Sequence, residues 1–379
     1  MNWVAWQMLT HERAKYLGLV FAIAFSTFLL ENQTSIFAGI LKRTASQILD
    51  VTDAEVWVMD PVTEYFEETK ALRDTALHRV RGVPGVAWAV RLYKGMPVAR
   101  TPGGRFAQTV VLGLDDATLV GAPRRMVMGS WARLQAPDSV VLDRAGHQLL
   151  FPGEPLQIGR RLELNDHAVT VVGISEASAP FSSFPVIHTR YSVALHFQGP
   201  ERNQMAYVLA RPSSESSPGA LCAAIQAQTG LRARTTEEFA WDCIRYYLRN
   251  TGIPVNFGIT IGIALIVGTV VAGQTFYLFT VENLRQFGTL KAIGVGNGRL
   301  VLMVLLQGGA VGLIGFAIGT GMAAAFFEAT QHLVATRGII LMLPSVLLTG
   351  GCMVFVVLLA SLLSLRRVLV LEPASVFRA

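Results

Sequence analysis

The stretch VENLRQFGTLKAIGVGNGRL, Val281 to Leu300, is short, polar and basic. It lies between two long uncharged runs, Asn250 to Val281 with 32 residues and Leu300 to Phe327 with 28. A bilayer core of about 30 Å needs roughly 20 helical residues, so either run can span a membrane. The stretch is therefore a short connection between two predicted spans, on one side of the membrane.

Two more spans are predicted from the rest of the chain. Gly338 to Leu365 holds 28 uncharged residues, and Tyr16 to Leu30 holds 15, followed by Glu31 and ten more to Leu41. The first span continues past Glu31 without a small-x-small cleavage site, so we expect a retained anchor. Charged residues make up 15% of the 379, against about 25% in soluble domains, which also indicates a membrane protein.

Basic residues near the span ends set the orientation, because they favour the cytoplasmic side. Three groups fall on one side if the spans alternate, which predicts cytoplasmic termini. The groups are Arg13 and Lys15, then Arg285, Lys291 and Arg299, and last Arg366, Arg367 and Arg378. These flanks account for part of the net charge of +6, and no basic block interleaves with aromatics, so nucleic acid is not an expected partner.

The predicted fold class is membrane α-helical, with four transmembrane helices and a large α+β extracytoplasmic domain of two lobes. The outer domain covers 41–249, with an α+β lobe at about 45–115 and 203–245 and a β-rich inserted lobe at about 116–202. The other predicted segments are an amphipathic cytoplasmic N-terminus (1–15), the spans 16–40, 250–281, 299–327 and 343–365, a cytoplasmic loop (282–298), an outer loop (328–342) and a cytoplasmic tail (366–379).

Local patterns predict elements of the outer domain. We expect a helix from about Glu67 to Val80 that ends near Gly82, and one over PGALCAAIQAQTGL that ends at Gly230. SVVLDRAGHQLLF, RRLELNDHAVTVVGISEA and YSVALHF have the texture of short strands. TTEEFAWDCIRYYLRN begins with a capping residue and acidic first turn, and we expect it to continue into the second span as a stalk.

The sequence contains no set of catalytic or cofactor-binding residues. There is no GxxxxGK[ST], HExxH or GxSxG motif, and the seven histidines lack metal-ligand spacing. GVGNGR follows no predicted strand, so a helix stop is the favoured interpretation. We therefore expect no enzyme activity, no metal and no cofactor in this chain.

Glu31 permits two interpretations. A carboxylate at membrane depth is costly and marks a functional site by default. However, Glu31 comes 16 residues after Lys15, about 24 Å along a helix, and Asn32 and Gln33 adjoin it. A place at the outer boundary is therefore favoured over a polar cluster facing a cavity.

Glycines and cysteines give two further candidates. Three pairs of glycines four apart predict close helix packing, within the chain or between two copies: Gly258 and Gly262, Gly308 and Gly312, Gly315 and Gly319. Cys222 and Cys243 both lie in the outer domain, where they could form a disulfide, although two free thiols are favoured.

The opening stretch predicts one amphipathic helix that ends at Gly294. Leu284, Phe287 and Leu290 follow helical spacing, whereas Arg285 and Lys291 are polar. Such a helix could lie on the cytoplasmic membrane surface, or dock into the groove of a partner. The residues alone leave both alternatives open.

A family resemblance bears on this choice. ENLRQFGTLKAIGVGNGRL resembles the loop of MacB/FtsX-type ABC transporter permeases, in which R-E-x-G-x-L-K-A-x-G-A joins the second and third spans. Gln286 and Val295 depart from that pattern. The tail LEPASVFRA resembles the family's ending, the inserted lobe resembles its second lobe, and the N-terminus resembles the DevC-like exporter subgroup. The matching residues are Arg285, Gly288, Leu290, Lys291, Ala292 and Gly294.

The resemblance implies a paired permease whose loop engages a separate cytoplasmic ATPase, which binds ATP and magnesium. Expected partners are two ATPase copies, a second permease copy, a periplasmic adaptor, an outer-membrane duct and membrane lipid. The expected function is export of an amphipathic substrate, such as a lipid, glycolipid, drug or peptide, from the bacterial inner membrane. The implied coupling residues are Glu282, Leu284, Arg285, Phe287, Gly288, Leu290, Lys291 and Gly294.

Two alternatives remain. One is an FtsX-like transmitter that controls a cell-wall hydrolase, and the other is a lipoprotein-release permease. The two-lobed outer domain favours the exporter, because the transmitter type tends to have a smaller one.

Overall fold

The computed structural model describes residues 7, 13–197, 205–331, 333 and 336–370. The chain forms two compact units. The membrane unit contains Met1–Gly39, Gly252–His332 and Ile339–Ala379, and the outer unit contains Ile40–Thr251 and Leu333–Gly338. The helix α2 and the loop between the last two spans therefore contribute to both units.

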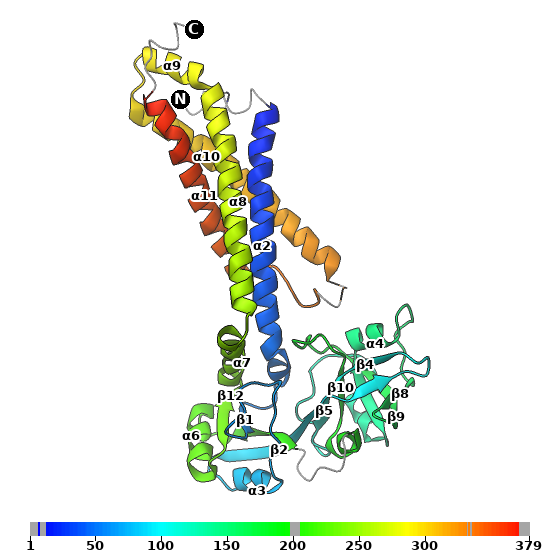
Figure 1. Ribbon diagram of the computed structural model, residues 1–379. Helices are drawn as coiled ribbons and strands as arrows, with labels where there is room; N and C mark the ends of the chain where they lie inside the picture. Colours follow the sequence, from blue (N-terminus) through cyan, green and yellow to red (C-terminus); the bar gives the residue numbers. More distant parts are fainter. Residues whose placement is uncertain (1–6, 8–12, 198–204, 332, 334–335, 371–379) are drawn as a thin grey trace. The chain divides into compact units, whose positions relative to one another are not determined.

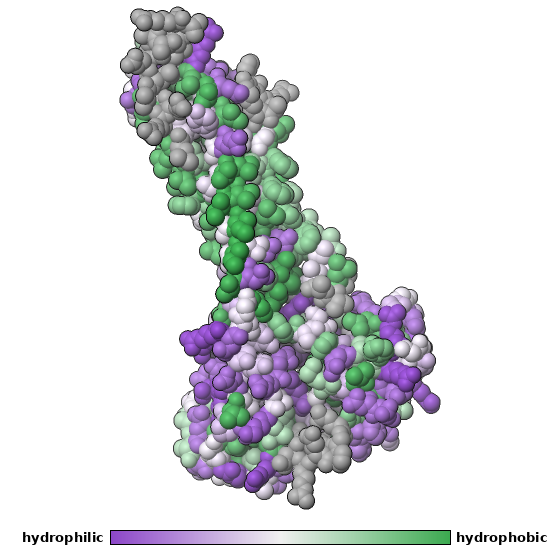
Figure 2. Space-filling model, viewed as in Figure 1, coloured by the Kyte–Doolittle hydropathy of each residue, from purple (hydrophilic) through white to green (hydrophobic). Residues whose placement is uncertain are grey.

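Four helices of the membrane unit are long and apolar enough to cross a bilayer (Figure 1). They are α2 (Arg13–Asp50), α8 (Ile253–Glu282), α10 (Asn297–Thr330) and α11 (Leu343–Val370). Hydrophobic residues dominate the middle of this unit on the face seen in Figure 2. The four predicted spans are thus present, although α2 extends ten residues beyond the predicted end of the first one.

The predicted stalk is wrong in one respect. The helix α7 (Thr236–Asn250) does not continue into α8, because Thr251 is extended with φ −124° and ψ 159°. Pro254 lies in the first turn of α8. A continuous helix would clash with this proline and lose its backbone hydrogen bond. The start of α7 is as predicted, since Thr235 and Glu238 form a capping box.

One mixed sheet runs through the outer unit, in the order β12-β1-β11-β2-β5-β10-β7-β9-β8-β3-β4, with β6 on β9. The two predicted lobes therefore share a sheet, and β3, assigned to the first lobe, pairs with β8 of the second. The strands are β1 (Val56–Met59), β2 (Val86–Gly95), β3 (Val98–Arg100), β4 (Phe106–Gln108), β5 (Val110–Leu114), β6 (Met126–Met128), β7 (Ser139–Asp143), β8 (Arg161–Leu164), β9 (His167–Ser175), β10 (Val186–Arg190), β11 (Met205–Pro212) and β12 (Arg232–Thr235).

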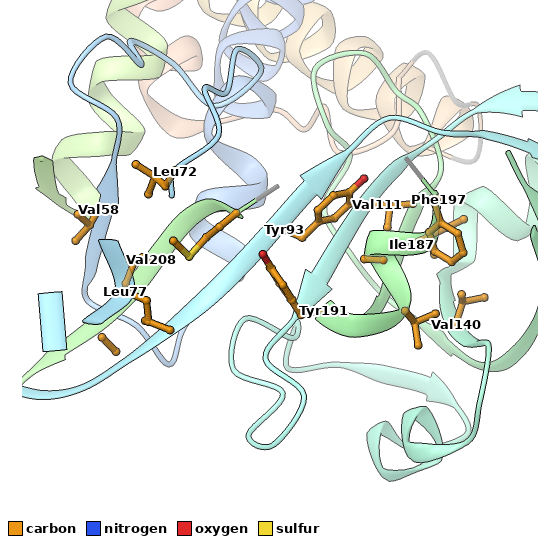
Figure 3. Packing of buried hydrophobic residues seen from close by; sticks show 14 of the residues in the cluster. Val58, Leu72, Leu77, Tyr93, Val111, Val140, Ile187, Tyr191, Phe197 and Val208 are labelled. Carbon is orange, nitrogen blue, oxygen red and sulfur yellow. The ribbon is translucent and has the colours of Figure 1, made fainter. Parts of the chain in front are cut away.

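Hydrophobic side chains cover both faces of this sheet. Val58 and Val208 belong to one buried cluster, seen in Figure 3, whereas Trp57 and Leu209 belong to another. Neighbouring residues of a strand point to opposite faces, so the sheet separates the clusters. The helices of the unit are α3 (Thr75–Arg81), α4 (Arg144–Leu150), α5 (Tyr191–Ala194), α6 (Pro218–Thr229) and α7, with 3₁₀ turns at Trp131–Gln135 and Leu195–Phe197.

Three local predictions for the outer unit are wrong in whole or in part. The helix expected from Glu67 begins only at Thr75, because tertiary partners take the backbone groups before it. The Phe66 carbonyl accepts from Tyr207 at 3.1 Å, and the Glu67 carbonyl accepts from buried Lys94 at 3.1 Å. SVVLDRAGHQLLF is a strand only over SVVLD, which is β7, and continues as the helix α4. YSVALHF contains no strand, because α5 and a 3₁₀ turn cover it.

Buried His188 predicts a pH dependence of the outer unit. Burial lowers the pKa of His188 to about 3, whereas the unfolded chain binds that proton near its ordinary value of about 6.5. The resulting stability is complete above pH 6.5 and is lost as the pH falls towards 3. We expect about 2 kcal/mol less stability at pH 5 than at pH 7 from this residue.

Hydrogen-exchange protection of the β10 amides at the two pH values measures this loss. In His188→Leu, the part of the stability loss between pH 7 and pH 5 that comes from this residue should be absent. An unchanged pH dependence in the variant would contradict the assignment to His188.

Candidate functional site

The connection between α8 and α10 is a short helix that turns sharply at a buried asparagine. The helix α9 (Leu284–Ala292) begins directly after Asn283, which also ends α8. The side-chain amide of Asn283 donates to the Phe279 carbonyl at 2.8 Å, and its own carbonyl accepts from the Phe287 amide at 3.1 Å. Asn283 therefore satisfies backbone groups of both helices, and α9 crosses the end of α8 (Figure 1).

The apolar side of α9 faces the ends of its own spans. Phe287 is completely buried against Leu300 and Met303 of α10 and Leu365 of α11, and Leu290 packs on the same cluster. Phe287 and Leu290 thus fasten α9 to the bundle, and Phe287 has no exposed surface left for a partner. Gly288 is also buried beside them.

The opposite side of α9 is open. Arg285, Gln286 and Thr289 are exposed, and Ile293, just past the helix, is 73% exposed. If α9 docks on another protein, this face makes the contact. Glu282 is exposed as well, and Leu284 is half-buried.

The end of α9 is fixed by two features. Gly294 has φ +94°, its amide donates to the Lys291 carbonyl at 3.1 Å, and the Val295 amide donates to the Leu290 carbonyl at 3.0 Å. This is a Schellman motif, which favours glycine at the left-handed position, so the predicted helix stop is confirmed. Lys291 Nζ donates to the Leu369 carbonyl in the last turn of α11 at 3.0 Å.

The glycine pairs of α10 lie at close helix contacts. A Cβ on Gly319 would be 2.5 Å from the Ala24 carbonyl oxygen of α2, and one on Gly315 would be 2.8 Å from Ile23. Gly308 and Gly312 meet α11 in the same way, at Ser361 and Val357.

The third pair behaves differently. A Cβ on Gly258 or Gly262 of α8 would meet nothing within 4 Å among the described residues. The predicted packing within the chain is therefore confirmed for α10, whereas α8 leaves its pair without a neighbour.

Glu31 lies in the interior of the membrane unit, packed between helices. It is completely buried, and its Oε1 accepts from the Thr320 hydroxyl of α10 at 2.8 Å. Its Oε2 and the hydroxyls of Thr27 and Ser35, one turn away on either side, have no hydrogen-bond partner among the described residues. The three residues form a polar row on α2 at four-residue spacing.

A buried ion pair in the outer unit was missed by the sequence analysis. Arg337, from the loop between α10 and α11, bonds Asp143 at the end of β7 at 2.7 Å. Asp143 Oδ1 also accepts from the amides of Gly146 and Val186. Burial raises the pKa of Asp143, and the Arg337 guanidinium opposes that shift. The pair is 194 positions apart in sequence, so no local pattern indicates it.

Arg337 is tied to the unit at two more points. Its guanidinium donates to the Ala177 carbonyl, and its own carbonyl accepts from Arg43 Nε at 3.1 Å. The span-connecting loop is thus built into the outer unit.

Cys222 and Cys243 are free, buried thiols, so the disulfide between them is not formed. Cys222 belongs to the cluster of Val58, and Cys243 belongs to that of Trp57. The sheet therefore lies between the two sulfur atoms.

Comparisons with known proteins identify the family. A family model described as the MacB-like periplasmic core domain matches residues 16–228, and one described as the FtsX-like permease C-terminal region matches residues 258–373. The chain belongs to the MacB/FtsX-type ABC transporter permeases. As a permease of this type it lies in the inner membrane and works with an ATPase partner.

The chain is also similar to ABC transporter permeases of known sequence and to solved periplasmic domains of such proteins. An uncharacterized ABC transporter permease of Mycobacterium bovis is 27% identical over 306 residues, covering 78% of this chain and 77% of the relative. One of Mycobacterium tuberculosis is 30% identical over 113 residues, covering 30% and 31%. The periplasmic region of MacB from Actinobacillus actinomycetemcomitans is 11% identical with a TM-score of 0.36, covering 54% of this chain and 96% of that one.

Gly319→Ala should destabilise this permease, because the added methyl group would overlap the Ala24 carbonyl. Overpacking of this kind costs about 1–3 kcal/mol. We expect a lower melting temperature of the purified protein in detergent. Gly321→Ala, two residues further along α10, is the matched control and should leave it unchanged, because a Cβ there meets nothing within 4 Å among the described residues. Equal melting temperatures for the two variants would contradict the α2–α10 contact.

Arg337→Ala should destabilise the outer unit by about 3–5 kcal/mol, because it leaves a buried charge on Asp143. Hydrogen exchange at β7 and β10 reports the effect. Adding Asp143→Asn should recover part of the loss, since the amide oxygen can still accept the two backbone bonds. Arg211→Ala, which breaks an exposed pair with Glu55, should cost less than about 1 kcal/mol. Similar losses in Arg337→Ala and Arg211→Ala would show that the buried pair is unimportant.

Proposed function

We propose that this permease converts ATP hydrolysis by a separate cytoplasmic ATPase into movement of its outer domain, and so exports an amphipathic substrate. The substrate class is a lipid or glycolipid, a drug or a peptide. The observation that carries the proposal is α9, a helix fastened to the span ends on one face and open on the other. The proposed orientation places α9 and both termini in the cytoplasm and the outer unit in the periplasm.

Because α9 is attached to several spans, a displacement of α9 is transmitted to all of them. It is covalently joined to α8, Phe287 packs against α10 and α11, and Lys291 bonds the end of α11. A partner that moves the exposed face of Gln286 and Thr289 therefore moves the ends of three helices. The proposed coupling element also includes the residues that flank this face, namely Glu282, Leu284, Arg285 and Gly294, the last of which ends the helix.

Movement of the spans reaches the outer unit through three chain segments. The first is α2, whose last turns are bonded within the outer unit by Ser46 and Gln47 to carbonyls of Ala179 and Ser178, at 2.8 and 2.7 Å. The second is the turn at Thr251. The third is the loop that Arg337 holds to Asp143. No step of this route requires a nucleotide-binding site in the permease itself.

The open surface of α8 supports a second permease copy. Only 11% of the most apolar stretch of this helix is buried within the unit, and Gly258 and Gly262 lie on it without neighbours. Small residues in such a position allow close approach of another helix. The proposed assembly is two permeases, two ATPases, and an adaptor that leads to an outer-membrane duct.

An FtsX-like transmitter of a signal to a cell-wall hydrolase, or a permease for lipoprotein release, would use the same mechanics. Purification of the tagged chain in mild detergent, with mass spectrometry of its partners, separates these functions. An ATPase with an adaptor supports the exporter. An ATPase with a wall hydrolase supports the transmitter, and the absence of an ATPase would contradict docking through α9.

The double variant Gln286→Ala, Ile293→Ala should lower permease-stimulated ATP hydrolysis by about tenfold, equivalent to roughly 1.4 kcal/mol of docking energy. The change removes exposed contacts only, so the melting temperature of the permease should stay the same. Phe287→Ala is the contrasting variant and should lower the melting temperature, since it opens a cavity under α9. Normal stimulation in the double variant would show that this face does not dock.

A further inference from the structure

A basic cavity lies in the outer unit at the end of α7 that leads to the second span. Its volume is about 200 Å³. Arg232 of β12 and Arg245, Tyr246 and Arg249 of α7 form much of its wall, together with the carboxylates of Asp242 and Glu64. No residue of this cavity belongs to the coupling route described above.

The charges around the cavity do not balance. Asp242 alone receives three guanidinium groups, from Arg232 at 2.8 Å, Arg234 at 3.0 Å and Arg245 at 2.9 Å. Arg234 does not itself line the cavity, whose charged lining is Arg232, Arg245 and Arg249 against Asp242 and Glu64. The lining therefore carries one positive charge in excess, which favours an anion.

Several donors in the cavity are unused. Arg249 has no hydrogen bond or ion pair with any described residue. Arg232 Nε is buried and also lacks a partner in that part of the chain. Arg245 uses one of its nitrogens on Asp242 and is half-exposed. Guanidinium groups with free N–H donors match the oxygen atoms of a phosphate.

The cavity adjoins the start of the second span along the chain. Asn250, on its wall, is the last residue of α7, and the span helix α8 begins at Ile253. Three Cα–Cα steps cover at most about 11 Å. Asn250, and with it this wall of the cavity, therefore lies no farther than that from the start of α8.

The outer face of α7 has the composition of a membrane interface. Trp241 is 55% exposed and Leu248 is 39% exposed. They alternate with Arg245 and Arg249 at spacings of three and four residues, which places the four on one side of the helix. Tryptophan and arginine beside exposed leucine are typical of helices at the headgroup level.

We propose that this cavity binds the phosphate headgroup of an anionic membrane lipid, in the leaflet that faces the outer unit. The guanidinium groups of Arg245 and Arg249 hold the phosphate, and Trp241 and Leu248 contact the start of the acyl chains. The proposal holds for a resident lipid and for a transported one, so it does not depend on the exporter assignment.

The test uses the full-length permease in detergent, without ATPase, and native mass spectrometry with phosphatidylglycerol and phosphatidylcholine of equal chain length. We expect preferential binding of phosphatidylglycerol. Arg245→Ala, Arg249→Ala should reduce its affinity about tenfold, as expected for the loss of charge-assisted contacts. Arg100→Ala, Arg105→Ala removes the same charge from exposed positions of the outer unit and should change nothing.

Two further experiments distinguish specific lipid binding at this site from loss of folding and from binding of free phosphate. Arg249→Glu alters a residue without a partner in the described chain, so it should weaken binding while the melting temperature is retained. Inorganic phosphate at the lipid's concentration should not displace phosphatidylglycerol. Displacement by phosphate would overturn the lipid assignment, and equal binding by wild type, the double variant and Arg249→Glu would overturn the site.

Discussion

The membrane unit depends on the close approach of two helix backbones, that of α2 and that of α10. Inside a bilayer the surrounding lipid is as apolar as leucine, so helices gain little by hiding large side chains from it. Close contact at Gly315 and Gly319 instead stabilises the helix pair by van der Waals packing. The same approach brings Glu31 within hydrogen-bond distance of Thr320, so the polar row on α2 faces α10 at this contact.

The outer unit is stabilised differently, by a hydrophobic core and a buried ion pair. It folds around a sheet with two hydrophobic clusters, and this would suffice for an independent domain. It nevertheless includes residues from a loop between spans, held by Arg337 on Asp143. A buried pair is weak evidence for stability, but breaking it leaves an unpaired charge, and that makes detachment of the loop costly. The pair therefore specifies which loop belongs to the unit.

Much of this architecture could be predicted from the sequence because it depends on local or periodic signals. The spans, the capping box at Thr235, the glycine stop at Gly294 and the general α+β character of the outer unit are of this kind. The features that could not be predicted depend on distant partners. The backbone before Thr75 is taken by Tyr207 and Lys94, and the orientation of α9 is fixed by α10 and α11.

The break at Thr251 has a mechanical consequence. The helix α2 enters the outer unit as one rigid rod of 38 residues, whereas α7 and α8 meet at a joint with an extended residue and a glycine. A continuous helix resists bending and twisting, whereas non-helical residues allow both. The chain therefore passes from one unit to the other once as unbroken helix, in α2, and once through non-helical residues, between α7 and α8. The two connections thus differ in stiffness, because only the helical one is held by continuous backbone hydrogen bonds.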